Sequence, residues 1–330
     1  MKVSVLGGSG YVGGELLRLV LGHPQLHLIQ ATSRRLAGQP LGVAHPNLRH
    51  IPDALFSTGD ELEPVDAAFV ALPPQAMTGW QQQVIESART VVNLGRDLRE
   101  DAQSGGDARA GRYRVGLPEL YRAELEGCTR ISVPGCMATA ATVALRPLAD
   151  AGLVDGDVVV DARTGSSGGG AEADAASHHP ERQHAFRVYK ATGHRHETEI
   201  ARMAGVHARM TVTAVPAVRG VQVVCYVRPP EPVTRTAVWD AYRARYAGEP
   251  FVRLVARRGG LHRLPDPQFL AGSNFVDVGF DVDADGDRIV AVAALDNLVK
   301  GAAGAGVQSL NVAAGMPERS GLEFPGLHPA

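Results

Sequence analysis

The sequence predicts a two-domain chain, with a parallel α/β domain first and an α+β domain after it. Its 330 residues are more than one compact hydrophobic core usually holds. Residues 65–72 form a nearly continuous apolar run, which is typical of strands that a parallel sheet buries on both faces. Residues 211–214, 220–227 and 275–282 alternate or run apolar, as antiparallel strands do. The two halves therefore differ in sheet type.

The elements follow from apolar spacing in chain order. In the first half we expect a strand at 2–6, a helix from 15 to 21 with Leu16, Leu17, Leu19 and Val20 at helical spacing, and strands at 26–31, 65–72, 90–94 and 131–133. In the second half we expect strands at 155–162, 211–214, 220–227 and 275–282, and helices at 234–245 and 296–314. Thr234 is a suitable N-cap for the first of these helices.

Composition and charge describe an ordinary globular chain. Hydrophobic residues make up 45% and charged residues 21%, with a formal net charge of −2. This balance gives no reason to expect nucleic acid or a membrane surface as a partner. No apolar run reaches the length of a membrane span, and we expect no signal peptide. Three widely spaced cysteines (Cys128, Cys136, Cys225) make no disulfide framework, which favours a cytoplasmic location.

A glycine loop joins the first strand to the first helix. Gly7, Gly10 and Gly13 have G-x-x-G-x-x-G spacing. In the order strand, loop, helix, such glycines let the backbone approach a pyrophosphate, and the helix N-terminus faces its charge. This context predicts a dinucleotide site.

The end of the second strand indicates which dinucleotide. Sites for NAD usually carry Asp or Glu there, to bind the ribose 2′-hydroxyl. This chain has Thr32, Ser33, Arg34 and Arg35 instead. Hydroxyls and guanidiniums suit a 2′-phosphate, so we expect NADPH/NADP+ as cofactor. The alternative is that the two arginines belong to a solvated loop.

Cys136 follows a sharp turn at Pro134-Gly135 and precedes a run of small residues that can open a helix. A cysteine near a helix N-terminus is favoured as thiolate, and the same N–H groups can hold an oxyanion. Cys136 is therefore a candidate covalent nucleophile. The alternative is a small buried side chain at the start of a helix.

The region after residue 162 carries two further candidate groups. Ser166, Ser167 and Gly168 lie in a Ser/Gly loop that could receive a phosphate or could be a flexible connector. Histidines then cluster at 178, 179, 184, 194 and 196, with Glu197 and Glu199 close by. Their spacing matches neither H-E-x-x-H nor a structural zinc set, so we expect no metal. Acid–base work by one imidazole, oriented by a carboxylate, is the better use.

Two features near the end of the chain complete the pattern. The predicted helix at 296–314 is rich in glycine, which indicates close packing against another backbone or a cofactor. Arg253, Arg257, Arg258 and Arg263 make a local positive patch. Such a patch is usually a solvated edge, but it could dock an acidic partner.

Together these motifs resemble the N-acetyl-gamma-glutamyl-phosphate reductase family, which shares its plan with aspartate-semialdehyde dehydrogenase. The resemblance covers almost the whole chain. It rests on the glycine loop 7–13, Thr32-Ser33-Arg34, Pro134-Gly135-Cys136 with Ala138-Thr139-Ala140, Gly193-His194-Arg195-His196 with Glu199, and residues 296–304.

The resemblance implies a fold and a set of site residues. The fold is a Rossmann-type NADP-binding domain (1–135, with the C-terminal helix at about 296–330) and an α+β catalytic and oligomerisation domain (136–295) of the semialdehyde-dehydrogenase type. Cys136 would attack an acyl phosphate, and NADPH would reduce the resulting thioester to an aldehyde with help from His194 or His196, oriented by Glu199. The implied cofactor contacts are Gly7, Ser9, Gly10, Tyr11, Val12, Gly13, Ser33, Arg34, Arg35 and Asn297, and the implied substrate or phosphate contacts are Ser166, Ser167, Gly168 and Arg195.

Finer features resemble the lysine-biosynthesis branch, whose α-aminoadipyl phosphate is attached to a small acidic amino-group carrier protein. They are residues 45–49 (His-Pro-Asn-Leu-Arg), 177–182, the Arg-rich stretch that runs through 265–267 (Pro-Asp-Pro), and 324–329. On this interpretation Arg253, Arg257, Arg258 and Arg263 would dock the carrier. An arginine-biosynthesis reductase, an enzyme for both substrates, and a non-catalytic NADP-binding sensor are the alternatives. A homo-oligomer, dimer or tetramer, is expected.

Three stretches depart from the family pattern: Met137, Pro74-Gln75 and residues 93–99. They remove no catalytic residue, but they bear on substrate discrimination.

Overall fold

The computed structural model describes residues 1–73, 81–96 and 113–329, which form two compact units. The first unit comprises residues 1–134 and 302–323, and the second comprises 135–301 and 324–330. The main break therefore lies one residue before the expected one. Segments 296–301 and 324–330, which were expected with the first domain, belong to the second unit. The Pro74-Gln75 departure, residues 97–99 and the glycine cluster at 104–106 lie outside the described residues.

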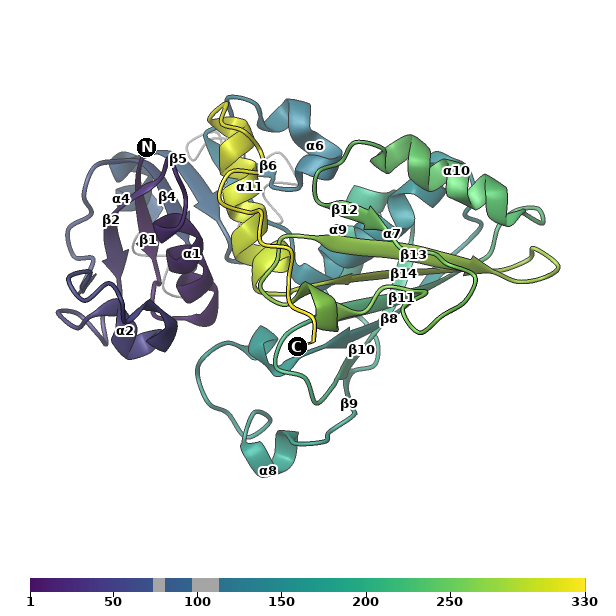
Figure 1. The fold of residues 1–330 in the computed structure, drawn as a ribbon, viewed down its shortest axis with the longest axis horizontal. Helices are drawn as coiled ribbons and strands as arrows, with labels where there is room; N and C mark the ends of the chain where they lie inside the picture. Colours follow the sequence, from purple (N-terminus) through teal and green to yellow (C-terminus); the bar gives the residue numbers. More distant parts are fainter. Residues whose placement is uncertain (74–80, 97–112, 330) are drawn as a thin grey trace. The chain divides into compact units, whose positions relative to one another are not determined.

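The first unit is built on a seven-stranded sheet, in the order β3-β2-β1-β4-β5-β7-β6, in which every pair of neighbouring strands is parallel (Figure 1). Its central strands bury nearly every side chain, as expected for a sheet covered on both faces. The strands are β1 (Lys2–Leu6), β2 (His27–Thr32), β3 (Phe56–Ser57), β4 (Val65–Val70), β5 (Ala88–Asn93), β6 (Arg114–Val115) and β7 (Arg130–Ser132). The strands predicted in this half are confirmed, with β1 as expected and the ends of the others shifted by no more than two residues.

Helices complete the first unit. They are α1 (Tyr11–Leu21), α2 (Leu41–Ala44), α4 (Gln81–Ser87), α6 (Pro118–Leu125) and α11 (Gly304–Ala313). The α1 helix begins four residues earlier than expected, inside the glycine loop, and buries its leucines against the sheet. The glycine-rich α11 packs on α1 and α6, and Gln308 in it donates to the buried Glu119 at 2.9 Å. Its small residues permit that close packing, as expected.

The second unit is built on a mixed seven-stranded sheet in the order β12-β13-β14-β11-β8-β10-β9. The strands are β8 (Val158–Thr164), β9 (Arg187–Lys190), β10 (Ala208–Ala214), β11 (Val221–Val227), β12 (Val252–Leu254), β13 (Val276–Val282) and β14 (Ile289–Leu295). The β11, β13 and β14 strands pair antiparallel, as expected for this half. For β10 that expectation holds on one side only, because it pairs antiparallel with β9 but runs parallel to β8, with the helix α9 (His196–Ala204) in the connection.

The helix that carries Cys136, α7 (Cys136–Asp150), packs against this sheet, α9 and α10 (Arg235–Tyr246). Pro147 lies inside α7 and has no N–H to offer the Val143 carbonyl one turn earlier. The Tyr246 hydroxyl donates to that carbonyl at 2.8 Å, and the Tyr242 hydroxyl donates to the next one at 2.6 Å. Two tyrosines of α10 therefore satisfy buried carbonyls of α7 and hold this helix in place.

The predicted helix at 296–314 begins later than expected. The buried Asp296 accepts N–H groups from Leu298 at 2.8 Å and Val299 at 3.3 Å. A π-helical turn (Val299–Ala303) follows, and α11 begins only at Gly304. The expected N-cap at Thr234 is confirmed, since its hydroxyl accepts the Ala237 N–H at 3.2 Å. No helix within the described ranges is long and apolar enough to cross a membrane.

Candidate functional site

The turn from β1 into α1 is shaped to receive a phosphate group. Gly7 has a φ of +82°, which favours glycine, and its N–H donates to the Thr32 hydroxyl at 3.1 Å. A Cβ on Gly13 would overlap the Gly7 carbonyl and Gly8. The backbone can adopt this tight turn only without those side chains, so the glycine spacing fits a dinucleotide pyrophosphate at the start of α1. Tyr11 and Val12 form the first turn of that helix.

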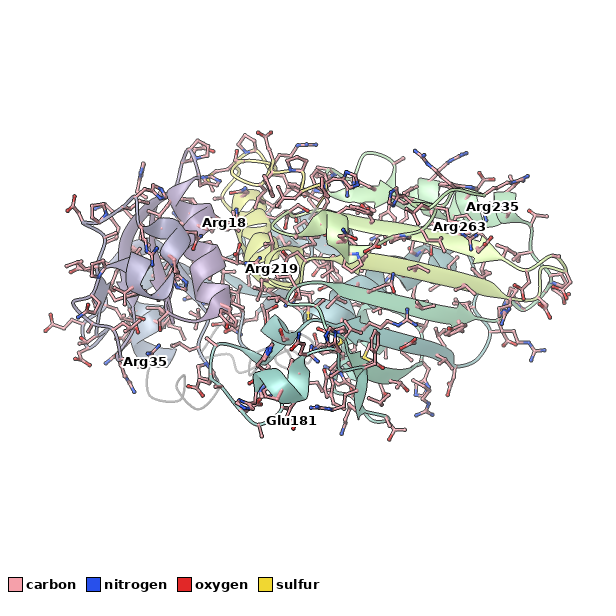
Figure 2. The ribbon with its side chains drawn as sticks, turned by 60° about the horizontal axis from the view of Figure 1, so that its bottom comes forward. Arg18, Arg35, Glu181, Arg219, Arg235 and Arg263 are labelled. Atoms are coloured by element: carbon pink, nitrogen blue, oxygen red, sulfur yellow. The ribbon has the colours of Figure 1, made fainter. Side chains whose placement is uncertain are left out.

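The end of β2 lies beside this turn. The buried Ser33 donates its hydroxyl hydrogen to the Ser9 hydroxyl at 2.9 Å, so the two predicted contacts come together. Arg34 and Arg35 follow in an exposed turn, and Figure 2 labels Arg35 in the first unit. No carboxylate follows β2 at this point. Hydroxyls and guanidiniums are groups that suit a ribose 2′-phosphate, and their contact with it stays a prediction.

In the second unit, Cys136 is the first residue of α7, with Gly135 as the N-cap in extended conformation. Its side chain is partly exposed, whereas most of the helix behind it is buried. The N–H groups of a first helical turn have no helical acceptor, and they point toward the N-terminal end. A Cβ added to Gly301 would lie 2.5 Å from the Cys136 Cβ. The π-helical turn therefore supports the cysteine through a bare glycine backbone.

Glu199 holds the peptide group that precedes this cysteine. Its Oε2 accepts the Gly135 N–H at 2.8 Å, and its Oε1 lies 3.7 Å from His196 Nε2. The His196 ring packs on Gly135 so closely that a Cβ there would overlap it. Both side chains are buried and come from the first turn of α9. Glu199 thus faces an imidazole and also orients the backbone at Cys136. The contact with the backbone was not predicted from the sequence.

The two histidines form one cluster. The ring centroids of His194 and His196 are 4.6 Å apart in an edge-to-face arrangement. The His194 Nδ1 accepts the His196 backbone N–H at 3.2 Å, so the hydrogen of the neutral ring is on Nε2. Burial, and then the positive charge of Arg195, lower the pKa of His194 to about 4. His194 is therefore a neutral imidazole near pH 7, with one N–H to donate.

Tyr189 is a further candidate that the sequence analysis did not identify. About half of its side chain is exposed (51%), yet desolvation of the hydroxyl raises the pKa of Tyr189, and the negative charge of Cys136 raises it further. The positive charges of Arg195 and Arg182 act in the opposite direction. The Tyr189 phenol therefore lies within electrostatic reach of the Cys136 thiol and of both guanidiniums. The sequence pattern Val-Tyr-Lys at 188–190 gave no signal that Tyr189 lies near Cys136.

The Ser/Gly loop is a short 3-10 turn (Ser166–Gly169) whose backbone is already engaged. The N–H groups of Ser166 and Ser167 donate to the carbonyls of residues 217 and 218, each at 2.9 Å. The Ser167 hydroxyl accepts from Asn297 Nδ2 at 2.9 Å, and Asn297 Oδ1 accepts the Gly220 N–H at 2.7 Å. Because the N–H groups of Ser166 and Ser167 already donate to carbonyls, a phosphate at this loop would bind mainly to hydroxyl groups. Asn297 ties two loops of the second unit together.

The basic patch is partly neutralised. Arg253 makes a bidentate pair with the buried Asp277, at 2.6 and 3.1 Å, and Arg263 pairs with Asp281 at 3.1 Å. Arg257 and Arg258 are exposed on the loop between them. Figure 2 shows Arg263 beside Arg235, which also binds Asp281. A cavity of about 430 Å³ adjoins this loop and is lined by Arg253, Val255, His262, Leu264, Asp266, Phe269, Asp277 and residues 325–328.

Within the described ranges, the one group of side chains close enough together to share a metal ion is Asp283, Asp285 and Asp287, in the turn between β13 and β14. None of the clustered histidines belongs to it.

Two family models match the chain. Residues 2–128 match the semialdehyde dehydrogenase NAD-binding domain, and residues 136–297 match the semialdehyde dehydrogenase dimerisation domain. The junction between the two matches contains the turn that precedes Cys136.

Full-length relatives agree with these matches. The LysW-L-2-aminoadipate 6-phosphate reductase of Deinococcus radiodurans is 42% identical over 340 residues, which cover 99% of this chain and 98% of that protein. A protein of Haloarcula marismortui, provisionally named a LysW-L-2-aminoadipate/LysW-L-glutamate phosphate reductase, is 45% identical over 337 residues, covering 99% and 97%.

Solved structures show the same fold at low identity. Aspartate semialdehyde dehydrogenase II of Vibrio cholerae, complexed with ASA, is 18% identical with a TM-score of 0.70, covering 94% of this chain and 97% of that one. The Candida albicans aspartate semialdehyde dehydrogenase with NADP is 17% identical with a TM-score of 0.70, covering 94% and 97%. With both domains matched, a cysteine at the start of its helix and the glycine turn after the first strand, the chain belongs to the semialdehyde dehydrogenase family of oxidoreductases.

Proposed function

We propose that this chain uses NADPH to reduce an acyl phosphate to an aldehyde, and that its substrate is α-aminoadipyl phosphate attached to a LysW-type carrier protein. The observation that carries the proposal is the group at the start of α7. There Cys136 is partly exposed, and the buried pair His196 and Glu199 packs against the peptide group that precedes it. An accessible thiol with an imidazole and a carboxylate beside it is the set of groups that covalent acyl transfer requires.

In the proposed reaction the acyl group passes through a thioester on Cys136, and each bond that forms is matched by one that breaks. The Cys136 thiolate attacks the acyl carbon, the carbon–oxygen bond to phosphate breaks, and a thioester remains on the sulfur. The N–H groups of the first turn of α7 stabilise the charge that develops on the carbonyl oxygen. Bound NADPH supplies the hydride for the reduction. The thiohemiacetal on Cys136 then releases the aldehyde and returns the thiolate.

We assign the stabilisation of the reacting carbonyl to His194 and the positioning to its neighbours. The neutral His194 ring keeps its N–H on Nε2, which can donate a hydrogen bond to the oxygen of the reacting carbonyl and stabilise the negative charge that develops there until the aldehyde and the Cys136 thiolate separate. His196 and Glu199 hold Gly135, and with it the nucleophile. Arg195 is exposed beside them and suits an anionic group of the substrate.

Cofactor specificity follows from the end of β2. Ser33, Arg34 and Arg35 would hold the 2′-phosphate of NADPH, next to Ser9 in the glycine turn. Gly7, Gly10, Tyr11, Val12 and Gly13 would carry the pyrophosphate. The role of Asn297 at the cofactor stays a prediction, as do phosphate contacts of Ser166, Ser167 and Gly168.

The carrier assignment is supported by the relatives named for LysW-bound substrates and by Arg257 and Arg258. Because Arg253 and Arg263 are paired with aspartates, the unpaired charge for an acidic carrier would come from the other two. Reversing them (Arg257→Glu with Arg258→Glu) should raise KM for a carrier-bound substrate and leave kcat unchanged. Arg243→Glu, at another exposed arginine, on α10, is the matched control.

We also propose that the chain acts as a cytoplasmic homo-oligomer that pairs through the sheet of the second unit. One face of that sheet is covered by α7, whereas Val159 and Tyr226, which are register partners on β8 and β11, are 49% and 40% exposed on the other. A second copy would cover this apolar surface. Val159→Glu should shift the mass measured by light scattering toward the monomer; an unchanged mass would contradict this pairing.

The activity is tested by following NADPH absorbance with three substrates in parallel: carrier-bound aminoadipyl phosphate, carrier-bound glutamyl phosphate and unattached N-acetylglutamyl phosphate. Turnover with the first alone supports the lysine assignment, and turnover with the first two indicates an enzyme for both. Turnover with the third alone makes this an arginine-pathway reductase. Cys136→Ser should abolish every activity, while Cys128→Ser, at a partly exposed cysteine of the first unit, should retain it. No NADPH oxidation by the parent protein would refute the reductase assignment.

A further inference from the structure

His45 reaches into the back of the glycine turn. It follows the short α2 helix, its side chain is buried (8% exposed), and its Nε2 lies 2.7 Å from the Gly8 carbonyl oxygen. A carbonyl can only accept, so the hydrogen of this bond is on the imidazole. His45 begins the stretch His-Pro-Asn-Leu, for which neither the fold nor the proposed chemistry has given a reason.

The ring is held in place from several sides. A Cβ on Gly14 would lie 2.5 Å from the His45 ring, so α1 presents bare backbone to it. Phe56 packs against the ring edge-to-face at 6.4 Å and also lies 3.1 Å from where a Gly8 Cβ would be. The backbone of His45 is anchored too, since its N–H donates to Leu41 and its carbonyl accepts from Leu48. This packing explains Gly14, which lies outside the G-x-x-G-x-x-G spacing.

The hydrogen bond fixes a peptide plane that matters for binding. The Gly8 carbonyl and the Ser9 N–H belong to one planar trans peptide unit, in which the two groups point in opposite directions. On the other side, the Gly8 N–H donates to the Thr32 carbonyl at 2.8 Å. With the Gly8 carbonyl held toward His45, the Ser9 N–H must point away from it, at the turn that precedes α1. Without the imidazole, this peptide unit loses a bond that favours this direction.

We infer that His45 is a positioning residue for cofactor binding, which orients the Ser9 N–H toward the pyrophosphate of the dinucleotide. The inference rests on the proposed use of NADPH and goes beyond it, because it assigns a role to a residue that does not touch the cofactor. It predicts that the imidazole contributes to binding of the pyrophosphate and not to binding of the 2′-phosphate, which Ser33 and the two arginines would hold.

The test compares His45→Leu, His45→Gln and His45→Asn by their affinity for NADPH, measured by cofactor fluorescence, and for 2′-AMP, measured by NMR titration. 2′-AMP carries the 2′-phosphate but no pyrophosphate. Losing the donor and leaving a buried carbonyl unsatisfied should weaken NADPH binding about tenfold to a hundredfold in His45→Leu. The Gln amide nitrogen extends about as far as Nε2 and should restore binding to within about threefold, whereas the shorter Asn should not. Affinity for 2′-AMP should stay unchanged in all three.

A second variant reaches the same bond from α1. Gly14→Ala would push the ring away from Gly8 and should weaken NADPH binding as His45→Leu does, without changing the affinity for 2′-AMP. If His45→Leu binds NADPH as tightly as the parent, the inference is wrong. It is also wrong if both ligands weaken in step with a lower melting temperature, because that would be a general loss of structure. Failure of the parent protein to bind NADPH would refute the proposed cofactor instead.

Discussion

The contact between Gly301 and Cys136 gives a prediction in which activity and stability separate. An alanine at 301 would place its Cβ 2.5 Å from the Cys136 Cβ, 3.1 Å from its Cα and 3.2 Å from Leu295 Cδ1. Ordinary carbon–carbon contacts lie at about 3.5–4.0 Å, so the start of α7 or the π-helical turn must move by about 1 Å. Overpacking of this kind costs about 1–3 kcal/mol of unfolding free energy, from which about 1 kcal/mol returns because alanine favours helix over glycine.

The activity should suffer far more than the stability. A displacement of about 1 Å at a reacting group can cost a factor of about 100. We expect Gly301→Ala to lose no more than about 2 kcal/mol in urea unfolding, while kcat falls about a hundredfold and Cys136 is alkylated by iodoacetamide more slowly. Alkylation reports on the thiolate without depending on the substrate.

Gly306→Ala is the matched control for this variant. It lies in the same glycine-rich segment, but a Cβ there would meet its nearest atom, Val92 Cγ1, at an ordinary 3.4 Å. It should be neutral or slightly stabilising and fully active. If Gly301→Ala keeps both kcat and the alkylation rate, the support of Cys136 by that turn is refuted.

Three other predictions concern the second unit. Tyr246→Phe should cost about 1–3 kcal/mol in urea unfolding, because the Val143 carbonyl stays buried without a donor; an unchanged midpoint would contradict this. Since the pKa of His194 is lowered to about 4 from 6.5, the unfolded chain binds more protons between these values, so stability should fall as pH drops from about 6.5 to about 4. His194→Asn should remove that part of the slope, and a slope identical to the parent's would argue against a buried neutral imidazole. Glu199→Ala should slow alkylation of Cys136 by releasing the Gly135 N–H, with Glu199→Gln as partial rescue; equal rates in all three proteins would contradict the role.

Local patterns were sufficient for the parts of the fold that depend on near neighbours in sequence. The apolar run at 65–72 predicted β4, and the glycine loop after Leu6 predicted the turn between β1 and α1. Both predictions were possible because strand burial and tight turns depend on residues that are adjacent in sequence. Thr234 was predicted as an N-cap for the same reason.

The remainder depends on contacts that no local pattern records. The direction of β10 relative to β8 follows from the path of α9 and not from its own alternation. β14 was not predicted, although its Val-Ala-Val-Ala run could have been recognised as a buried strand. In the site, the pairing of Glu199 with the Gly135 N–H joins residues 64 positions apart, and Tyr189 is placed near Cys136 by the sheet. The motif resemblance identified Glu199 as a site residue but did not predict that it binds the Gly135 N–H.

The most direct test of the central claim is the mass of the intact protein after mixing with an acyl phosphate in the absence of NADPH. The account predicts one added acyl group, located by peptide mapping on Cys136 and discharged when NADPH is added. No adduct with any of the three acyl phosphates, or an adduct that persists in Cys136→Ser, would contradict reduction through a cysteine thioester.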